Sequence, residues 1–250
     1  MKSPFFSVIT ICFNSSKSIL SCLNSLYSQD FKDYEHIIQD GDSEDNTIKI
    51  IESLRNKKTY IVSEKDNGLY DALNKAIKRC KGKYILLLHS DDRLYDQKTL
   101  RRLFEFICIK NHPEVIITGV EIIGKNKNVK RRWMPSLPTK FKINTGWMAP
   151  HTGIILKSNI AKISEPYDIS LKISADYDYE ISLFRKYQSN TFLAKFILTK
   201  MSEGGISNSG IKTKLNKTKE DFIVMRRNKI NPLIGIIFKN IRKVNQLLHI

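Results

Sequence analysis

The sequence has few cysteines for its length. Four cysteines occur in 250 residues, at Cys12, Cys22, Cys80 and Cys108. Their wide and irregular spacing matches no zinc-binding pattern, and four are too few for a disulfide framework in a chain of this size. Cys12 and Cys80 lie within apolar patterns, so we expect buried thiols there and a reducing compartment.

Long hydrophobic segments are also lacking. No stretch approaches the roughly 18 consecutive apolar residues that a membrane-spanning helix needs. The apolar residues 1–14 include Ser and Thr and lack a small-residue cleavage site, so a strand is expected there rather than a signal peptide. We expect neither secretion nor a transmembrane helix, and we expect a cytoplasmic protein.

Acidic residues are outnumbered by basic ones, 25 against 42, which gives a net charge of +17. Residues 121–145 hold seven basic residues and one acidic residue, and residues 211–250 hold ten and two. A nucleic-acid-binding protein would spread this charge over its fold. The two basic segments instead favour an anionic surface or substrate, such as phospholipid headgroups or a diphosphate. Hydrophobic residues make up 41% of the chain, which excludes wholesale disorder.

Strand-like and helix-like segments alternate through the first part of the chain. Apolar runs at 5–13, 34–39, 59–64 and 83–92 are expected to be strands, and the amphipathic segments between them are expected to be helices. Short connections between alternating strands and helices are typical of a parallel sheet that is covered on both faces. The sequence therefore predicts an α/β fold.

The pattern is weaker after about residue 112. Residues 114–124 are expected to form a strand, residues 146–157 a turn that leads into a strand, and residues 176–187 a helix. Residues 124–145 are basic and contain two prolines, so a loop is expected there.

The most informative polar residues are Asp91 and Asp92, at the end of the fourth expected strand. Two adjacent carboxylates near a hydrophobic core repel each other unless a cation or hydroxyl groups compensate their charge. A divalent metal with a bound diphosphate would do so, because hard oxygen ligands suit Mg²⁺ or Mn²⁺. The alternative is that the pair caps the N-terminus of a following helix.

Polar residues also follow the other three expected strands, at Asn14, Asp40 and 64–66. In parallel sheets, ligands bind at the carboxyl ends of the strands, so these groups are candidates for one site. Asp40 could accept hydrogen bonds from a ribose or a base, and Gly41 permits close approach of a ligand. Each segment also has a structural alternative: the 40–45 loop could cap a helix, and the polar residues of 64–74 could be solvated.

Four segments together carry a family resemblance: ITICFN, IIQDGDSEDNT, SEKDNGLYDALNKAI and GKYILLLHSDD, within residues 5–95. In this order and spacing they resemble the donor-binding half of GT-A glycosyltransferases of family 2, most closely the bacterial colanic-acid or O-antigen branch. The resemblance implies a GT-A fold, with a Rossmann-like, mostly parallel sheet flanked by helices. It also implies a metal-dependent enzyme that uses a nucleotide sugar, commonly a UDP-sugar.

The resemblance also implies roles for particular residues. Asp40 matches a contact to the nucleotide base, Asp91 a contact to the ribose or sugar, and Asp92 the ligand of Mn²⁺ or Mg²⁺. On the same basis the donor site is expected to include Thr10, Phe13, Asn14, Asp66 and Asn74. Two positions depart from the family pattern, because Asp42 replaces a usual Gly and His89 a common Asn.

On the acceptor side, residues 173–179 resemble the acidic motif of the family. The usual Glu-Asp is Ala175-Asp176 here, so the role of catalytic base falls on Asp176, ahead of Asp178. An inverting transfer needs such a base to take the proton of the attacking hydroxyl. Without the resemblance, Asp176 would be interpreted as a helix cap.

Two further residues are candidates for the acceptor or diphosphate site. His151 could contact the diphosphate or the acceptor, or could be a hydrogen-bonded core histidine. Trp147 could stack on a sugar, or could be buried. Residues 204–207 match a glycine-rich turn that could close over the donor, or could be an ordinary turn.

The last part of the chain, residues 232–250, has a helical apolar face opposite Lys239 and Arg242. The face consists of Ile234, Ile237, Phe238, Ile241 and Leu248. A basic amphipathic helix can lie on an anionic membrane, but packing on the domain or dimerisation would also cover this face.

We therefore predict a glycosyltransferase domain over residues 1–210 with a basic helical tail over 211–250. Residues 1–95 would bind the nucleotide sugar and residues 96–210 the acceptor. The expected reaction is inverting hexosyl or N-acetylhexosaminyl transfer from a UDP-sugar to a saccharide, with a polyprenyl-diphosphate-linked glycan of O-antigen or capsule synthesis as the expected acceptor. The expected place is the inner face of the cell membrane.

Two other functions are alternatives to this prediction. A nucleotidyltransferase would bring a glycine-rich phosphate loop, which residues 10–20 lack. A nucleic-acid-binding protein would not need acidic strand ends, so no nucleic acid partner is expected.

Overall fold

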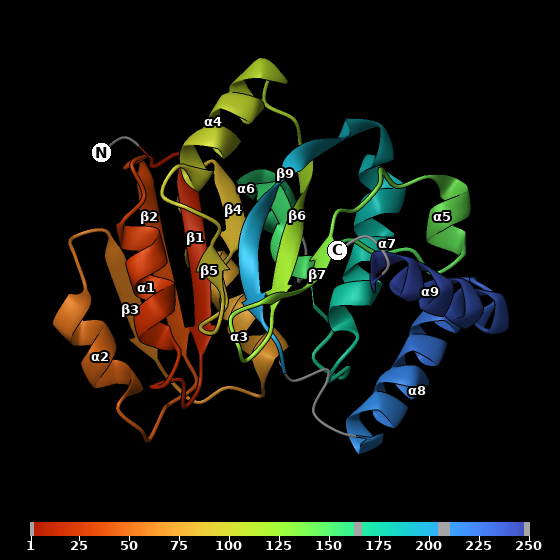
Figure 1. Ribbon diagram of the computed structural model, residues 1–250, viewed down its shortest axis with the longest axis horizontal. Helices are drawn as coiled ribbons and strands as arrows, with labels where there is room; N and C mark the ends of the chain where they lie inside the picture. The colour runs from red at the N-terminus through yellow and green to blue at the C-terminus, as the bar shows by residue number, and fades with distance from the viewer. Residues whose placement is uncertain (1–2, 163–166, 205–210, 248–250) are drawn as a thin grey trace.

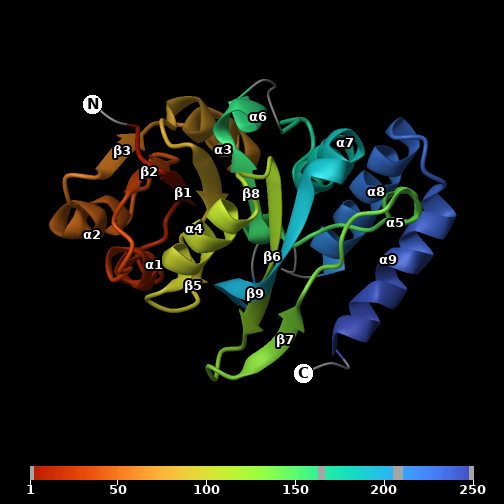
Figure 2. The ribbon, with the colours of Figure 1, turned by 90° about the horizontal axis from the view of Figure 1, so that it is seen from above.

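One mixed sheet forms the centre of the molecule, with helices on both faces (Figures 1 and 2). The computed structural model describes residues 3–162, 167–204 and 211–247, with the backbone alone at 211–212 and 244–247. In Figure 2, α3, α6 and α7 lie on one side of the sheet and α1 and α4 on the other. The predicted α/β architecture is confirmed.

The first part of the chain is a regular alternation of strands and helices. Its elements are β1 (Phe6–Cys12), α1 (Ile19–Tyr27), β2 (Tyr34–Asp40), α2 (Thr47–Leu54), β3 (Thr59–Ser63), α3 (Leu69–Arg79) and β4 (Tyr84–Leu87). The four strands are parallel and lie in the order β3-β2-β1-β4. Because β1 lies between two neighbours and is buried on both faces, its sequence is apolar almost throughout.

The side chains of β1 divide between two cores according to the alternation of a strand. Ile9 and Ile11 pack with Leu73 and Ala76 of α3 in one cluster. Phe6 and Val8 pack with Leu26 of α1 in the other. Helix α3 therefore lies against one face of the sheet and α1 against the other.

The second part of the chain widens the sheet with antiparallel strands. Its elements are β5 (Arg93–Leu94), α4 (Thr99–Ile109), β6 (Val115–Ile123), β7 (Val129–Trp133), α5 (Lys140–Asn144), a 3-10 turn η1 (His151–Gly153), β8 (Ile154–Lys157), α6 (Ser158–Lys162), α7 (Ala175–Tyr187), a 3-10 turn η2 (Gln188–Asn190) and β9 (Thr191–Ser202). The sheet continues from β4 in the order β8-β6-β9-β5, and β7 pairs with β6. Strand β8 is antiparallel to both of its neighbours, whereas β9 runs parallel to β6.

Two sequence expectations need correction. The expected strand 83–92 ends at Leu87, because residues 88–92 bend into a turn in which the Asp92 N–H donates to the carbonyl of His89 at 2.9 Å. The expected loop 124–145 contains β7 and α5. Strand β7 is missed because its side chains are exposed or half-buried, so its charged composition hides its pairing with β6.

The last residues form two helices, α8 (Ile211–Arg227) and α9 (Pro232–Leu247). Helix α8 contacts the start of α7, where the Glu220 carboxylate accepts hydrogen bonds from the backbone N–H groups of Lys172, Ile173 and Ser174. Among the described residues, no helix is both long and apolar enough to cross a bilayer. Leu248 lies outside the described residues.

Candidate active site

The carboxyl ends of β1, β2, β3 and β4 meet at one edge of the sheet, in the lower part of Figure 1. Cys12 pairs with Asp40, and Asp40 with Ser63, so three strand ends are level. A hydroxyl contact of 2.9 Å between Ser15 and Ser90 links the segments that follow β1 and β4. The polar segments predicted to converge on this edge therefore do converge.

The Asp40 side chain is fully buried and holds the loop that follows β2. Its carboxylate accepts hydrogen bonds from the Ser43 N–H at 2.9 Å, the Ser43 hydroxyl at 2.5 Å and the Ser63 hydroxyl at 2.7 Å. Asp42 in this loop has a φ of +67°, a left-handed conformation that glycine adopts without strain. This conformation is a physical reason why the family that the sequence resembles usually has glycine at this position. Asn14, with a φ of +46°, closes the loop by accepting from the Glu44 N–H at 3.0 Å.

An exposed aromatic ring and a carboxylate flank Gly41. The Phe13 side chain, at the end of β1, is 61% exposed. A Cβ atom on Gly41 would lie 2.7 Å from Oδ2 of Asp66 and 3.4 Å from the Phe13 ring. The exposed Phe13 ring, next to Gly41 and Asp66, offers a face on which a flat base could stack.

Two residues expected in the donor site serve inside the protein. The Thr10 hydroxyl is fully buried, donates to the carbonyl of Leu88 at 2.8 Å and lies 2.9 Å from Nε2 of His36. The Asn74 amide exchanges hydrogen bonds of 2.8 and 3.2 Å with the backbone of Tyr167. Both side chains are buried and hydrogen-bonded within the protein, so their contact with a donor stays a prediction.

The acid pair lies on the turn that follows β4. Asp92 is 2% exposed, and its Oδ2 has no hydrogen-bond partner. Burial raises the pKa of the Asp92 carboxyl well above its ordinary value, and the neighbouring Asp91 charge adds to the effect. Burial also raises the pKa of Asp91. The pair does not cap a helix, because β5 follows it and α4 begins only at Thr99.

A divalent cation fits this environment. The described residues contain no group of three or more His, Cys, Asp or Glu side chains placed to hold a metal. Mg²⁺ is commonly bound through one or two carboxylates, with phosphate oxygens of a substrate and waters completing its shell. The buried, unpartnered oxygen of Asp92 suits that arrangement, because a cation would compensate a charge that the protein leaves uncompensated.

Asp176 lies in the first turn of α7. Its Oδ1 accepts hydrogen bonds from the Tyr177 N–H at 2.8 Å and from the Tyr70 hydroxyl of α3 at 3.2 Å. Asp178 turns toward α8 instead, where it accepts from Arg227 at 3.1 Å and Asn228 at 2.6 Å. Of these two acids, Asp178 is occupied by structural contacts.

Aromatic contacts connect the acid pair to Asp176. The His89 ring, two residues before Asp91, lies 5.8 Å from the His151 ring. His151 Nε2 is 2.8 Å from the Tyr167 hydroxyl, and Tyr167 stacks on Tyr70 at 5.5 Å. Burial lowers the pKa of His151, and lowers that of His89 to about 3, so both rings are neutral at physiological pH.

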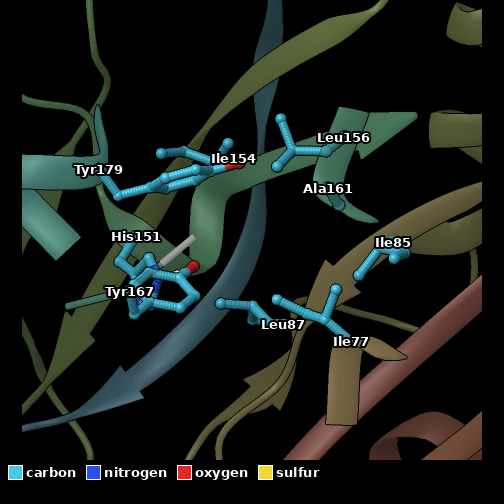
Figure 3. Close-up of a pocket in the computed structure, with 9 residues that line it drawn as sticks. All are labelled: Ile77, Ile85, Leu87, His151, Ile154, Leu156, Ala161, Tyr167 and Tyr179. Carbon is cyan, nitrogen blue, oxygen red and sulfur yellow. Dashed lines mark hydrogen bonds between the residues drawn. The ribbon is translucent and has the colours of Figure 1, made fainter. Parts of the chain in front are cut away.

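An apolar pocket lies beside this contact chain, between the sheet and α3, α6 and α7 (Figure 3). Figure 3 shows the His151 and Tyr167 rings together on one side, with Ile77 and Ile85 on the other and Leu87 between them. His151 therefore lines the apolar pocket and is hydrogen-bonded to Tyr167, as a core histidine would be.

The Trp147 side chain is 5% exposed and packs edge-on against Phe184. Of the two alternatives for this residue, the structure thus shows the buried one. Gly204 follows β9, but residues 205–207 of the expected glycine-rich turn lie outside the described residues.

Sequence reasoning did not single out Tyr70, Tyr167 or Glu180. Tyr70 lies within one of the four segments that carry the family resemblance, and this position is the one feature of the sequence that could have indicated a role for it in the site. Tyr167 and Glu180 have no pattern around them. The buried Glu180 carboxylate accepts from the Ala149 N–H at 2.8 Å through Oε2, while Oε1 has no partner.

Replacing Glu180 with Gln is expected to flatten the pH dependence of stability. Burial, and then the charge of Asp176, raises the pKa of Glu180 well above its ordinary value of 4.5. Because the folded state holds this proton more tightly than the unfolded state, stability falls as pH rises from that value through the raised pKa. The amide keeps an acceptor for Ala149, so Glu180→Gln should match or exceed the wild-type melting temperature at about pH 8.

Melting temperatures from about pH 5 to about pH 8 would test this expectation. The exposed Glu105 provides a matched control, and Glu105→Gln should leave the profile unchanged. A loss of melting temperature in Glu180→Gln at every pH would contradict the account.

Comparison with known proteins gives the family. A family model described as glycosyl transferase family 2 matches residues 7–166, which is more than half of the chain. A PGL/p-HBAD biosynthesis glycosyltransferase of Mycobacterium tuberculosis is 28% identical over 216 residues, or 84% of this chain and 81% of that protein. The poly(ribitol-phosphate) beta-N-acetylglucosaminyltransferase TarS of Staphylococcus aureus is 35% identical over 135 residues, or 52% of this chain and 22% of TarS.

Solved structures share the fold. TarS 1–349 in complex with UDP-GlcNAc matches with a TM-score of 0.69 and 24% identity, over 88% of this chain and 65% of that chain. This chain therefore spans just under two thirds of the solved TarS chain. The mannosyltransferase PcManGT from Pyrobaculum calidifontis, solved with GDP-Man and Mn²⁺, matches with a TM-score of 0.63 and 15% identity, over 95% and 69% of the two chains. The fold is thus of the GT-A type, and the chain belongs to glycosyl transferase family 2.

Proposed function

We propose that this glycosyltransferase moves a sugar from a UDP-sugar to a saccharide hydroxyl, with Mn²⁺ or Mg²⁺ at Asp92. The observation that carries the proposal is the buried, unpartnered Oδ2 of Asp92 at the edge where the four parallel strands end. A carboxylate kept there without a counter-charge is costly unless a ligand supplies one. A nucleoside diphosphate with its metal would do so.

On the donor side, three features would hold the nucleotide. Phe13 offers a face for the base, Gly41 permits its close approach, and Asp66 lies beside both. Asp40 would act mainly by holding the loop, because its carboxylate is already hydrogen-bonded within it. Asp91, more exposed than Asp92, would accept hydrogen bonds from the ribose or the sugar.

On the acceptor side, Asp176 would act as the base. Its carboxylate would take the proton of the acceptor hydroxyl while that oxygen attacks the anomeric carbon. The bond from the sugar to the diphosphate breaks on the opposite face, so the configuration inverts. The Tyr70 hydroxyl, whose one proton is shared between the Ile173 carbonyl at 2.7 Å and Asp176 at 3.2 Å, would help to position the carboxylate. When bound, the metal would stabilise the charge of the leaving diphosphate.

The donor nucleotide and the acceptor are further parts of the proposal. TarS, related to this chain in sequence over 135 residues, has been solved with UDP-GlcNAc and with UDP, which supports a UDP-linked hexose or N-acetylhexosamine as donor. We propose a polyprenyl-diphosphate-linked glycan at the inner face of the cell membrane as acceptor, in O-antigen or capsule synthesis. One relative is named a PGL/p-HBAD biosynthesis glycosyltransferase and the other a poly(ribitol-phosphate) beta-N-acetylglucosaminyltransferase, and the acceptor proposed here is inferred from the family resemblance instead.

A donor screen that measures nucleotide release would test the proposal. We expect release of UDP from one UDP-sugar, stimulated by lipid-linked saccharide mimics and lost when EDTA removes the metal. Full activity in EDTA, or activity only with GDP-sugars, would contradict the metal or the donor assignment respectively. Transfer of a nucleoside monophosphate would instead identify a nucleotidyltransferase.

A further inference from the structure

Helix α9 presents an apolar face to solvent. Five of its side chains, which we call the α9 row, are 36–70% exposed: Leu233, Ile234, Ile237, Phe238 and Ile241. Each is three or four positions from another member of the row, which places all five along one side of the helix. Phe141 of α5, 66% exposed, extends the row, with its ring centroid 6.1 Å from that of Phe238. Contiguous exposed apolar surface of this kind commonly marks an interaction site.

The opposite, charged face of α9 is the one that packs on the domain. Lys239 lies 2.8 Å from the Asp221 carboxylate and 3.8 Å from the centre of the Tyr177 ring. Arg242 donates to the carbonyl of Thr145 at 2.5 Å and to its hydroxyl at 2.6 Å. A Cβ atom on Gly235 would lie 2.6 Å from Sδ of Met225, so this glycine permits close packing on α8. These contacts fix the helix with the α9 row outward, so packing on the domain does not cover the row.

Among the side chains described in residues 213–243, which belong to α8, α9 and the turn between them, every exposed charged side chain is basic. The two acids of this segment point inward, because Glu220 binds backbone N–H groups before α7 and Asp221 binds Lys239. The exposed basic side chains are Lys214, Lys219, Arg226, Lys229 and Lys243. Arg227 is also exposed, but it is ion-paired with Asp168 at 2.8 Å and Asp178 at 3.1 Å, so it adds no uncompensated charge. On α8 they alternate with the exposed apolar residues Leu215, Phe222 and Ile223.

We propose that the outward faces of α8 and α9, together with Phe141, bind an anionic lipid bilayer. Apolar side chains of such a surface enter the boundary between headgroups and acyl chains, and its cations meet the lipid phosphates. A symmetric contact between two copies of the chain would instead place the cations of both copies together. The charge therefore favours a lipid surface over a second copy.

The position of this surface suits the reaction proposed above but does not depend on it. In both ribbon views, α8 and α9 lie at the end of the molecule opposite α2 and β3 (Figures 1 and 2). Helix α8 contacts residues 172–174, just before Asp176. Binding through α8 and α9 would thus place the membrane beside the acceptor half and away from the nucleotide half.

Co-sedimentation of the full chain with vesicles would test this inference. We expect binding to phosphatidylglycerol–phosphatidylcholine vesicles, at least about tenfold weaker binding to pure phosphatidylcholine, and weakening with salt. The double variant Ile237→Asn/Ile241→Asn should lose most of the binding. The control Ile109→Asn changes an isoleucine of α4 that is 78% exposed, and it should bind like the wild type.

A second variant tests the contribution of the basic side chains of α8 to vesicle binding. Lys219→Glu/Arg226→Glu should weaken binding to anionic vesicles by more than about tenfold, without removing an apolar contact of the α9 row. Because both side chains are exposed, this variant tests the surface even if the α9 variant folds poorly. Absence of wild-type binding to anionic vesicles would overturn the proposal. If sedimentation equilibrium then showed a dimer that the α9 variant dissociates, a second copy would be the occupant.

Discussion

Replacing Asp92 with Asn is expected to remove metal-stimulated sugar transfer and to lower kcat/KM at least about a hundredfold. The amide has nearly the shape of the carboxylate but carries no charge, so it would bind a divalent cation poorly. Without metal, the same variant should be at least as stable as the wild type, because burial and the Asp91 charge disfavour the ionised carboxylate. The variant should also lose the decline in metal-free stability as pH rises above 3.8 through the raised pKa of Asp92.

Transfer rates and melting temperatures, each with and without Mn²⁺, would measure both effects. Asp96→Asn is the matched control, because Asp96 is a nearby acid paired with Arg102 at 2.8 Å on the surface. This control should keep full activity and change stability by at most about 1 kcal/mol. Unaltered metal-stimulated turnover in Asp92→Asn would rule out the metal assignment.

Replacing Asp176 with Asn is expected to abolish transfer while the protein still binds UDP and metal. Loss of a general base typically lowers the rate by roughly 10²–10⁴-fold. The amide can still accept the hydrogen bonds of Tyr70 and Tyr177, so the start of α7 should persist. Single-turnover transfer and calorimetric titration with UDP would separate the two properties.

Asp178→Asn is the control for this experiment, because it removes a carboxylate two residues away that is bonded to Arg227 and Asn228. It should retain transfer with a modest loss of stability. If Asp176→Asn lost UDP binding, Asp176 would belong to the donor side. If Asp178→Asn lost transfer instead, the two roles would be exchanged.

Local patterns predict the donor half of the fold well, because each element carries its own signal. The apolar strands and the amphipathic helix α3 appear in the sequence almost as they are in the structure. Parallel strands end at one edge of a sheet, so alternation alone places Asp91 and Asp92 near the ends of β1 and β2. The structure excludes the alternative that the pair caps a helix, because α4 begins only at Thr99.

Contacts between distant segments were not predictable from local patterns. Tyr70 and Asp176 lie 106 positions apart in the chain, and nothing in either segment specifies the other. The family resemblance places Thr10 and Asn74 in the donor site, but in the structure both side chains are buried and hydrogen-bonded to the backbone of distant segments. For α9, the periodicity of the sequence predicts an apolar face and a charged face but not which of them packs on the domain. The charged face packs because Lys239 pairs with Asp221, which lies on α8.

The most direct test of the donor site is a crystal structure of the protein with UDP and Mn²⁺, with the metal located by anomalous scattering. We expect a manganese peak bonded to the Asp92 carboxylate and to the diphosphate, with the uracil against Phe13 and Gly41. A metal held elsewhere, or a diphosphate bound away from the end of β4, would contradict this expectation.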